Sequence, residues 1–314
     1  MELSFSSITP GRGRRCPLAG PLHRGRVKTP QWNPCLLSIG RPKNFVQLSS
    51  RRSGYWKRKD AHFKVLCGQM DERGVVHVVE GSCIDEIYDA LAKRLLPTAT
   101  TTSNSNYKYL VALAGPPGAG KSTLAHEVVS RINKSWPEKS TSLDSQVKPS
   151  DVATVVPMDG FHLYRSELDA MEDPQEAHAR RGAPWTFNPS RLLACLKSLR
   201  SQGSVYAPSF DHGIGDPVED DIFVNLQHKV VIVEGNYLLL EDGIWKELSS
   251  LFDEKWFIDV DIDKAMHRVL KRHISTGKPP DVAEYRIEYN DRPNAELVMK
   301  SKNNADLVIK SIDF

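Results

Sequence analysis

Nine consecutive residues of this chain have the composition of a phosphate-binding loop. The segment from Gly115 to Ser122 fits the pattern G-x-x-x-x-G-K-[ST] and separates an apolar run from an amphipathic stretch. Glycines let the main chain curl so that successive N–H groups point at phosphate oxygens, and a following helix adds partial positive charge. Lys121 would contact the outer phosphates, and Ser122 would hold Mg²⁺. We therefore expect a nucleoside triphosphate site made of Gly115, Pro116, Pro117, Gly118, Ala119, Gly120, Lys121, Ser122 and Thr123.

Two acidic residues follow other apolar runs of the chain. Asp159 comes after residues 153–158, and Glu234 comes after Val230–Val233. Carboxyl ends of parallel strands point into the ligand crevice of such a sheet. A carboxylate there can take the proton from an attacking hydroxyl or hold Mg²⁺ through water. We expect Asp159 to be the base, with a turn aspartate as the alternative, and Glu234 to hold the metal with Ser122.

Two arginines are spaced for one face of a helix. Arg268 and Arg272 are four residues apart in the amphipathic stretch 264–275, so both guanidinium groups would project together. An arginine that closes over transferring phosphates is worth ~10³–10⁵ in rate in related systems. We expect these two arginines to belong to a lid, with a solvated basic face that includes Lys271 as the alternative.

These groups need a sheet with helices on both faces. Short apolar runs at 109–114, 153–158, 229–233, 255–260 and 307–312 alternate with amphipathic stretches at 121–133, 190–200, 243–251 and 264–275. That alternation is typical of an α/β fold with a doubly wound, mostly parallel sheet in three layers. With the loop at 115–122, it predicts the fold of the P-loop nucleoside triphosphate hydrolases over residues 107–314.

The residues before this domain fall into two parts. Residues 1–67 are rich in Arg, Ser and Pro and lack periodicity, which favours a disordered transit peptide, to the chloroplast or alternatively the mitochondrion. A basic tail that binds polyanions is the other interpretation. Residues 68–106 read as a helical extension and linker, with apolar residues at helical spacing from Ile84 to Leu95 and a stop at Pro97.

The charge and the apolar content of the sequence argue against several other classes of protein. Residues 1–70 hold 14 of the 42 Lys and Arg and 2 of the 39 Asp and Glu, so the remaining chain carries a net charge of −9. An acidic body is unsuited to binding nucleic acid, which needs clustered positive charge. No apolar run is long enough to cross a membrane. The five cysteines form no C-x-x-C pair, which argues against a disulfide scaffold or a zinc site.

Several motifs together resemble the phosphoribulokinase, uridine kinase and pantothenate kinase family. These are VALAGPPGAGKST, VVPMDGFH, RRGAPWTFN, PSFDH, VVIVEGNYLLL and YNDRPNAELV, in the expected order from about residue 108 to the C-terminus. The resemblance implies a kinase that uses ATP and Mg²⁺ to phosphorylate a hydroxyl of a small metabolite. A nucleoside such as uridine or cytidine, pantothenate and a sugar all stay open as acceptors. A nucleotide-binding regulatory protein without transfer activity is the alternative.

The resemblance also implies roles for individual residues. Asp159 would be the catalytic base with Lys121, Arg268 and Arg272, and homodimers are expected. DGFH replaces the Asp-x-Phe-Tyr of uridine kinases, and no counterpart of the regulatory cysteine pair of phosphoribulokinase lies near the loop. Each histidine could instead be structural, and Asp211 with His212 could be a simple loop pair. The implied acceptor pocket consists of Asp159, His162, Arg181, Phe187, Asp211, His212 and Asn236.

Overall fold

The structure, a computed structural model, describes residues 65–71, 74–101, 106–136, 151–211 and 213–311. The predicted transit peptide lies outside these residues, except that Val65 to Cys67 already belong to a strand. The extent of the transit peptide stays a prediction. Within the described residues, no helix is both long and apolar enough to cross a membrane.

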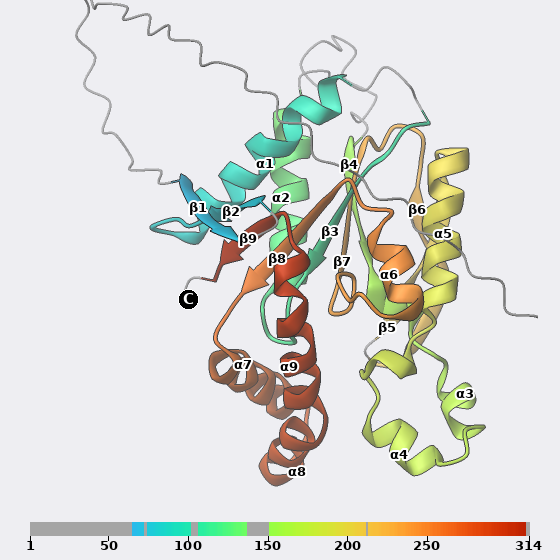
Figure 1. The fold of residues 1–314 in the computed structure, drawn as a ribbon. Coiled ribbons are helices and arrows are strands. Elements are labelled where there is room, and N and C mark those ends of the chain that lie inside the picture. The colour runs from blue at the N-terminus through green and yellow to red at the C-terminus, as the bar shows by residue number, and fades with distance from the viewer. Residues whose placement is uncertain (1–64, 72–73, 102–105, 137–150, 212, 312–314) are drawn as a thin grey trace, which may run out of the picture. The chain divides into compact units, whose positions relative to one another are not determined.

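The central sheet has seven strands in the order β1-β2-β9-β8-β3-β7-β4 (Figure 1). Five of the six neighbouring pairs are parallel, and only β1 and β2 are antiparallel. The predicted doubly wound, mostly parallel sheet is confirmed. Its strands are β1 (Val65–Asp71), β2 (Gly74–Val79), β3 (Tyr109–Ala114), β4 (Ala153–Pro157), β7 (Val230–Gly235), β8 (Glu254–Asp259) and β9 (Leu307–Lys310).

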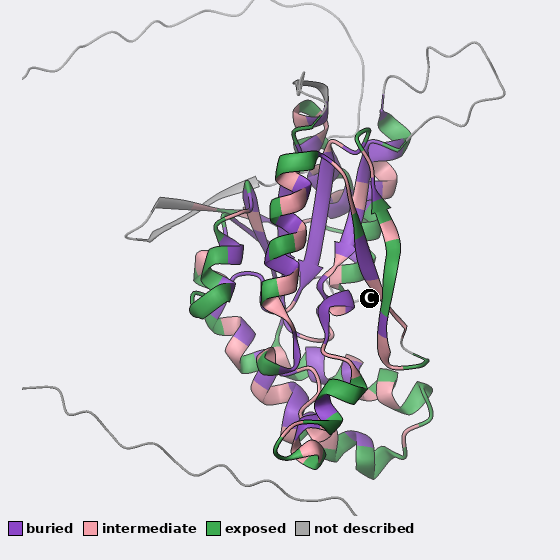
Figure 2. Ribbon diagram, turned by 90° about the vertical axis from the view of Figure 1, so that its right-hand side faces the viewer, coloured by how far each residue is buried: buried purple, intermediate pink, exposed green. Residues whose placement is uncertain are grey.

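Alternate residues of each strand enter two separate cores, as the two-residue period of a strand requires. In β3, Val111 and Leu113 belong to one cluster, whereas Leu110 and Ala112 belong to the other. Figure 2 shows the strands buried between helices that expose only their outer faces. The first core is covered by α1 (Ile84–Thr101) and α2 (Lys121–Ser135), and the second by α5 (Pro189–Gln202) and α6 (Gly243–Ser249).

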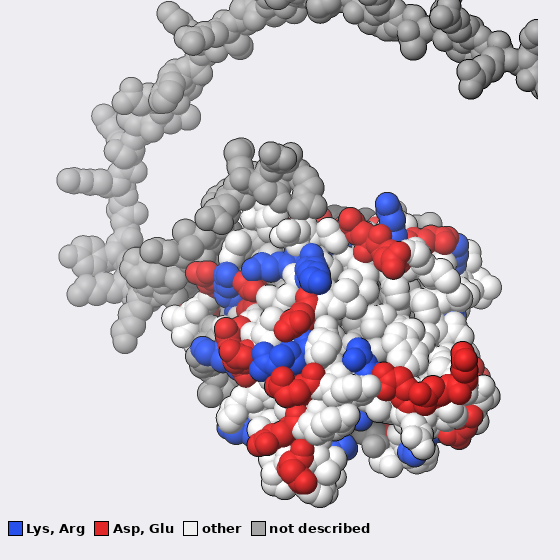
Figure 3. All heavy atoms as spheres, turned by 60° about the horizontal axis from the view of Figure 1, so that its bottom comes forward, with Lys and Arg blue, Asp and Glu red and all other residues white. Residues whose placement is uncertain are grey.

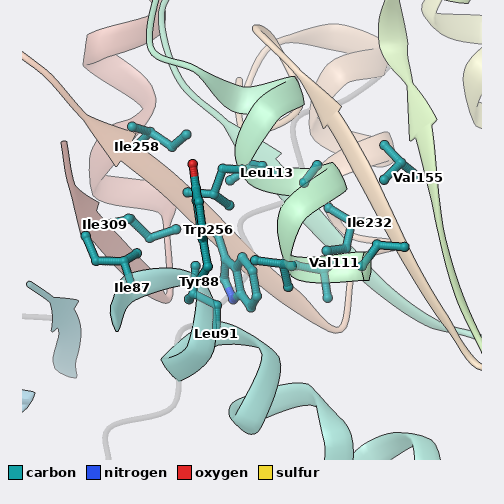
Figure 4. Packing of buried hydrophobic residues seen from close by; sticks show 14 of the residues in the cluster. Ile87, Tyr88, Leu91, Val111, Leu113, Val155, Ile232, Trp256, Ile258 and Ile309 are labelled. Carbon is teal, nitrogen blue, oxygen red and sulfur yellow. The ribbon is translucent and has the colours of Figure 1, made fainter. Parts of the chain in front are cut away.

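Helix α1 belongs to the main core. Ile87, Tyr88 and Leu91 pack around Trp256 of β8, together with isoleucines of β8 and β9 (Figure 4). The predicted stop at Pro97 is wrong, because α1 continues through Thr101 with the proline inside it. Proline usually breaks a helix by removing one hydrogen bond. Here the burial of Leu95 and Ala99, on either side of Pro97, favours continuation.

Short elements gather beyond the carboxyl ends of the strands, at the bottom of Figure 1. The final helix is interrupted by a π-helical turn, Ile287–Asp291, a feature often found at functional sites. Of these helices, only Ile262–Ser275 was predicted from the periodicity, as residues 264–275, and the hairpin was not predicted. The helices are α3 (Arg165–Asp169), α4 (Pro174–Ala179), α7 (Ile262–Ser275), α8 (Pro280–Arg286) and α9 (Arg292–Lys300), and the hairpin, which runs up beside α5 in Figure 1, consists of β5 (Val205–Asp211) and β6 (Asp216–Val224).

Candidate active site

Strand register brings the predicted chemical groups to one edge of the sheet. Glu234 of β7 lies opposite Leu113 of β3 on one side and Pro157 of β4 on the other. The phosphate-binding loop leaves β3 two residues after Leu113, and Asp159 follows Pro157 by two residues. The loop and both carboxylates therefore emerge side by side at the carboxyl edge.

The loop between β3 and α2 is held in a conformation that requires glycine. Gly118 has a φ of 80°, and a Cβ there would lie 2.3 Å from the carbonyl oxygen of Ala265. The Lys121 ammonium donates a hydrogen bond to the carbonyl oxygen of Pro116 at 3.1 Å. Over this loop lies a cavity of about 330 Å³, lined by Gly118, Gly120, Lys121, Ser122, Thr123, Arg268, Val269 and Arg272. Of the other predicted loop residues, Gly115, Pro116 and Ala119 shape the turn without lining this cavity.

Ser122 and Glu234 are suited to hold a magnesium ion. The Ser122 hydroxyl donates a hydrogen bond to Oε1 of the buried Glu234 at 2.9 Å. Hydroxyl and carboxylate oxygens are the ligands that Mg²⁺ prefers, with phosphates and water completing its shell. The donor set therefore fits, and a bound Mg²⁺ would neutralise charge on the phosphates. Within the described residues, no cluster of three or more His, Cys, Asp and Glu forms a protein-only metal cage.

Lys121, Asp159 and Glu234 interact electrostatically. Burial raises the pKa of Glu234, and the Asp159 carboxylate raises it further, while Lys121 and the Ser122 hydroxyl oppose the shift. Burial lowers the pKa of Lys121, and Glu234 and Asp159 oppose that shift. The charges of these groups therefore interact strongly, because burial removes the water that would screen them. The Lys121 ammonium and the Asp159 carboxylate carry opposite charges. A transferring phosphoryl group would lie between the loop that carries Lys121 and Asp159.

Asp159 is positioned by a 3-10 turn, Met158–Phe161, that packs tightly against the hairpin. A Cβ on Gly160 would lie 2.1 Å from the carbonyl oxygen of Pro208 in β5. The glycine of the DGF motif is therefore needed for a close approach of two backbone segments. This contact orients the turn that carries the carboxylate.

Replacing Gly160 with alanine should disturb both stability and activity. We expect Gly160→Ala to destabilise the protein by ~1–3 kcal/mol, since an added methyl group in a packed interface forces the backbone apart. Turnover should fall as well, because Asp159 is the preceding residue. Thermal melting and steady-state kinetics would measure both. The control is Gly213→Ala, where a Cβ would meet only the flexible Asp211 side chain; equal losses in both variants would contradict the role of the Pro208 contact.

A second, larger cavity of about 460 Å³ adjoins the loop at the same edge. Its volume lies in the range of small-molecule sites. Five of the seven predicted acceptor residues line it: Asp159, His162, Arg181, Phe187 and Asn236. It meets the smaller cavity at Arg272, which lines both.

His162 and Arg181 are held in place by aromatic and polar contacts. The His162 ring lies between Phe187 and Phe210, with ring centroids 3.9 and 4.7 Å away. Its Nδ1 lies 2.8 Å from the backbone oxygen of Asp159. The Arg181 guanidinium lies over Phe210, at 5.7 Å from the ring centroid, and donates to the carbonyl oxygen of Leu163 at 2.9 Å. Both side chains therefore present a defined orientation to the cavity.

Asp211 does not line the cavity and is used in the hairpin turn. Its Oδ1 accepts hydrogen bonds from the backbone N–H groups of Gly213 and Ile214, at 2.7 and 3.1 Å. An aspartate that caps its own turn in this way is a common turn device. The sequence motif PSFDH thus reflects hairpin geometry at this position. His212 lies outside the described residues, so its predicted role stays a prediction.

The cavity contains further side chains that sequence reasoning missed. They come from α3, α4 and the segment from α7 to α9, of which the periodicity predicted only α7. Asp291 was within the YNDRP motif, but no role was assigned to it; its carboxylate contacts His273 at 2.8 Å. The π-helical turn that places Asp291 inward leaves no periodic signal. The missed lining residues are Arg165, His178, His273, Lys278, Arg286, Asp291 and Asn294.

The two lid arginines occupy different positions. Arg268 donates to the carbonyl oxygen of Gly118 at 3.3 Å and to the Ser311 hydroxyl at 3.4 Å, so it braces the phosphate loop. Arg272 lies where the two cavities meet and is close enough to lower the pKa of Lys121. Both side chains line the smaller cavity, and their role in a lid stays a prediction.

Comparison with known proteins agrees with this geometry. Residues 110–313 match the model of the Phosphoribulokinase / Uridine kinase family, which covers most of the chain. The chain belongs to that family. Members of the phosphoribulokinase/uridine kinase family are small-molecule phosphotransferases, so membership implies ATP and, typically, Mg²⁺ as cofactors.

Three relatives of the family are informative. A Schizosaccharomyces pombe protein with the name "Putative uridine kinase" is 35% identical over 74% of this chain and 92% of its own length. The ATP-dependent kinase YFH7 of Zygosaccharomyces rouxii is 26% identical over 68% of this chain and 86% of its own length. The crystal structure titled "putative fructose transport system kinase" from a Silicibacter species matches with a TM-score of 0.59 and 29% identity, covering 70% of this chain and 98% of that one.

Proposed function

We propose that this protein transfers the γ-phosphate of ATP to a hydroxyl group of a small metabolite bound in the larger cavity. The observation that carries the proposal is the position of Asp159. Its carboxylate lines the cavity for the acceptor and acts electrostatically on Lys121 of the phosphate loop. A hydroxyl in the larger cavity would thus lie between its base and the phosphoryl group.

The chain's own residues supply the parts that this transfer needs. Main-chain amides of the loop and Lys121 hold the phosphates, and Arg272 lies where charge develops between the two cavities. Asp159 accepts the proton of the attacking hydroxyl. Phosphoryl transfer depends mainly on positioning and charge stabilisation, so no covalent intermediate on the protein is needed.

A metabolite screen with the full chain tests the proposal. ADP should form with Mg·ATP only when a hydroxylated acceptor is present, and mass spectrometry should detect the product at the mass of the acceptor plus one phosphoryl group. Nucleosides, pantothenate and sugars belong in the library as separate groups. Binding of ATP without transfer to any acceptor in the library would contradict the proposal and favour a nucleotide-binding regulatory role.

We also propose that residues 1–67 address the protein to the chloroplast. The basic, acid-poor composition of this segment supports an organelle address. A fluorescent protein fused after residue 70 should accumulate in plastids of plant cells, and the mature N-terminus should lie near residue 65. Accumulation in mitochondria, or an intact leader in the mature protein, would contradict the plastid address.

A further inference from the structure

The larger cavity carries an excess of positive charge. Five cationic side chains line it, Arg165, Arg181, Arg272, Lys278 and Arg286, against the two carboxylates of Asp159 and Asp291. Asp291 is already paired with His273 at 2.8 Å. In the described part of the chain, no carboxylate lies at ion-pair distance from Arg165, Lys278 or Arg286. Lys278 and Arg286 are half-buried there, and cations partly withdrawn from water without counter-charges favour a ligand that supplies the opposite charge.

These cations are separate from those that serve the nucleotide. The smaller cavity over the phosphate loop is lined by Lys121, Arg268 and Arg272. Of the five cations of the larger cavity, only Arg272 also lines the smaller one. The other four therefore face the acceptor and not the loop.

Within this group of cations, Arg181 and Arg286 are joined by a hydrogen bond. A terminal guanidinium nitrogen of Arg286 donates to the carbonyl oxygen of Arg181 at 3.1 Å, and Asn290 donates to the same oxygen at 3.0 Å. Arg181 is fixed by Leu163 and by Asp216, at 3.2 Å. The Nε atoms of Arg181 and Arg286 are buried, and neither has a hydrogen-bond partner. A buried N–H without an acceptor is unfavourable, and an anionic oxygen would supply the missing acceptor.

The aromatic lining is less suited to a nucleobase. His162 fills the space between Phe187 and Phe210, and the Arg181 guanidinium lies over Phe210. These rings already pack against one another, in tilted arrangements, or against a cation. On the face of the molecule shown in Figure 3, Lys and Arg side chains are interspersed with Asp and Glu side chains. The lining of the cavity, in contrast, is predominantly cationic. The cavity therefore favours a small anion over a polyanion.

We infer that the acceptor is a hydroxylated metabolite with its own carboxylate or phosphate group, held by Arg181 and Arg286 while its hydroxyl faces Asp159. This inference rests on the proposed function, because it takes the larger cavity as the acceptor site. Arg165 and Lys278 would add long-range attraction for the same anionic group. Neutral sugars and nucleosides would leave Arg165, Lys278 and Arg286 without a counter-charge.

Calorimetry with three probes tests the inference without knowledge of the natural acceptor. Gluconate, glycerol 3-phosphate and uridine would each be titrated into the full chain saturated with Mg·ADP, which occupies the phosphate loop. We expect at least one anionic probe to bind at least about 10-fold more tightly than uridine, with affinity falling as salt rises. Preference for gluconate or for glycerol 3-phosphate would distinguish a carboxylate from a phosphate ligand. Tighter binding of uridine would overturn the inference.

Substitutions of two arginines test which side chains of the cavity bind the anion. Arg286→Gln should weaken binding of the anionic probe by about 10- to 100-fold, since a charged hydrogen bond is lost. Binding of uridine and ADP should stay unchanged. Arg165→Gln, at an exposed position on α3, should weaken binding of the anionic probe less. Lys197→Gln on α5, outside the cavity, is the charge-matched control, and melting curves check that each variant folds. An unchanged affinity in Arg286→Gln would overturn the inference.

The same experiments separate the two proposals. Phosphate transfer to neutral acceptors, with no loss in Arg286→Gln, would contradict the anionic acceptor and leave the kinase function in place. Anion binding that depends on Arg286, without transfer to any acceptor, would contradict the kinase function and leave the anion site in place.

Discussion

Asp159→Asn should lower turnover by ~10²–10⁴-fold, the range that a positioned general base contributes. Asparagine has nearly the same size as aspartate and cannot accept the proton of the attacking hydroxyl. Because Asp159 lines the acceptor cavity and not the cavity over the phosphate loop, the affinity for Mg·ATP should change little. Steady-state kinetics with the acceptor found in the metabolite screen would measure turnover, and a fluorescent ATP analogue would measure nucleotide binding.

The matched control for this variant is Asp221→Asn. Asp221 is exposed on β6 and lines neither cavity, so its loss of charge should leave turnover unchanged. If Asp159→Asn turned over as fast as the unaltered protein, Asp159 would not be the base. If it lost nucleotide binding as well as turnover, its role would instead be to organise Lys121 and Glu234.

Arg272→Ala should lower turnover by about 10³-fold or more, as expected for an arginine that stabilises transferring phosphate. Its position at the junction of the two cavities places the guanidinium between nucleotide and acceptor. Arg268→Ala should act differently, because Arg268 contacts Gly118 and Ser311. We expect that variant to raise the KM for ATP more than it lowers turnover.

Lys271→Ala provides the control on the same helix. Lys271 precedes Arg272, is exposed and lines neither cavity. Its replacement should leave both kinetic constants unchanged. A larger loss of turnover in Arg268→Ala than in Arg272→Ala would reverse the assignment of the two arginines.

Local signals predicted the central part of this fold well. The phosphate loop requires glycines at fixed spacing, and the strands beside it are apolar on both faces because helices cover both. Those requirements are visible in any single stretch of the chain. The sheet interior and the helices α2, α5, α6 and α7 were therefore predicted within a few residues of their observed bounds.

The edges of the fold were harder to predict. Pro97 would end an isolated helix, and only the burial of Leu95 and Ala99 explains why α1 continues. Strand β1 pairs with β2 at the edge of the sheet, although its first three residues fell within the predicted leader. Such elements depend on neighbours distant in the chain, so local composition misjudges them.

The sequence by itself determined the nucleotide half of the site, because a loop, a hydroxyl and a carboxylate at the ends of neighbouring strands must meet at one edge of a parallel sheet. Only the tertiary structure decided the acceptor half. Arg165, Arg286 and Asp291 come from short helices and a π-helical turn with no periodic pattern, and Asp211 leaves the pocket because it caps its own hairpin. The charge of the acceptor cavity thus depends on how separate segments pack.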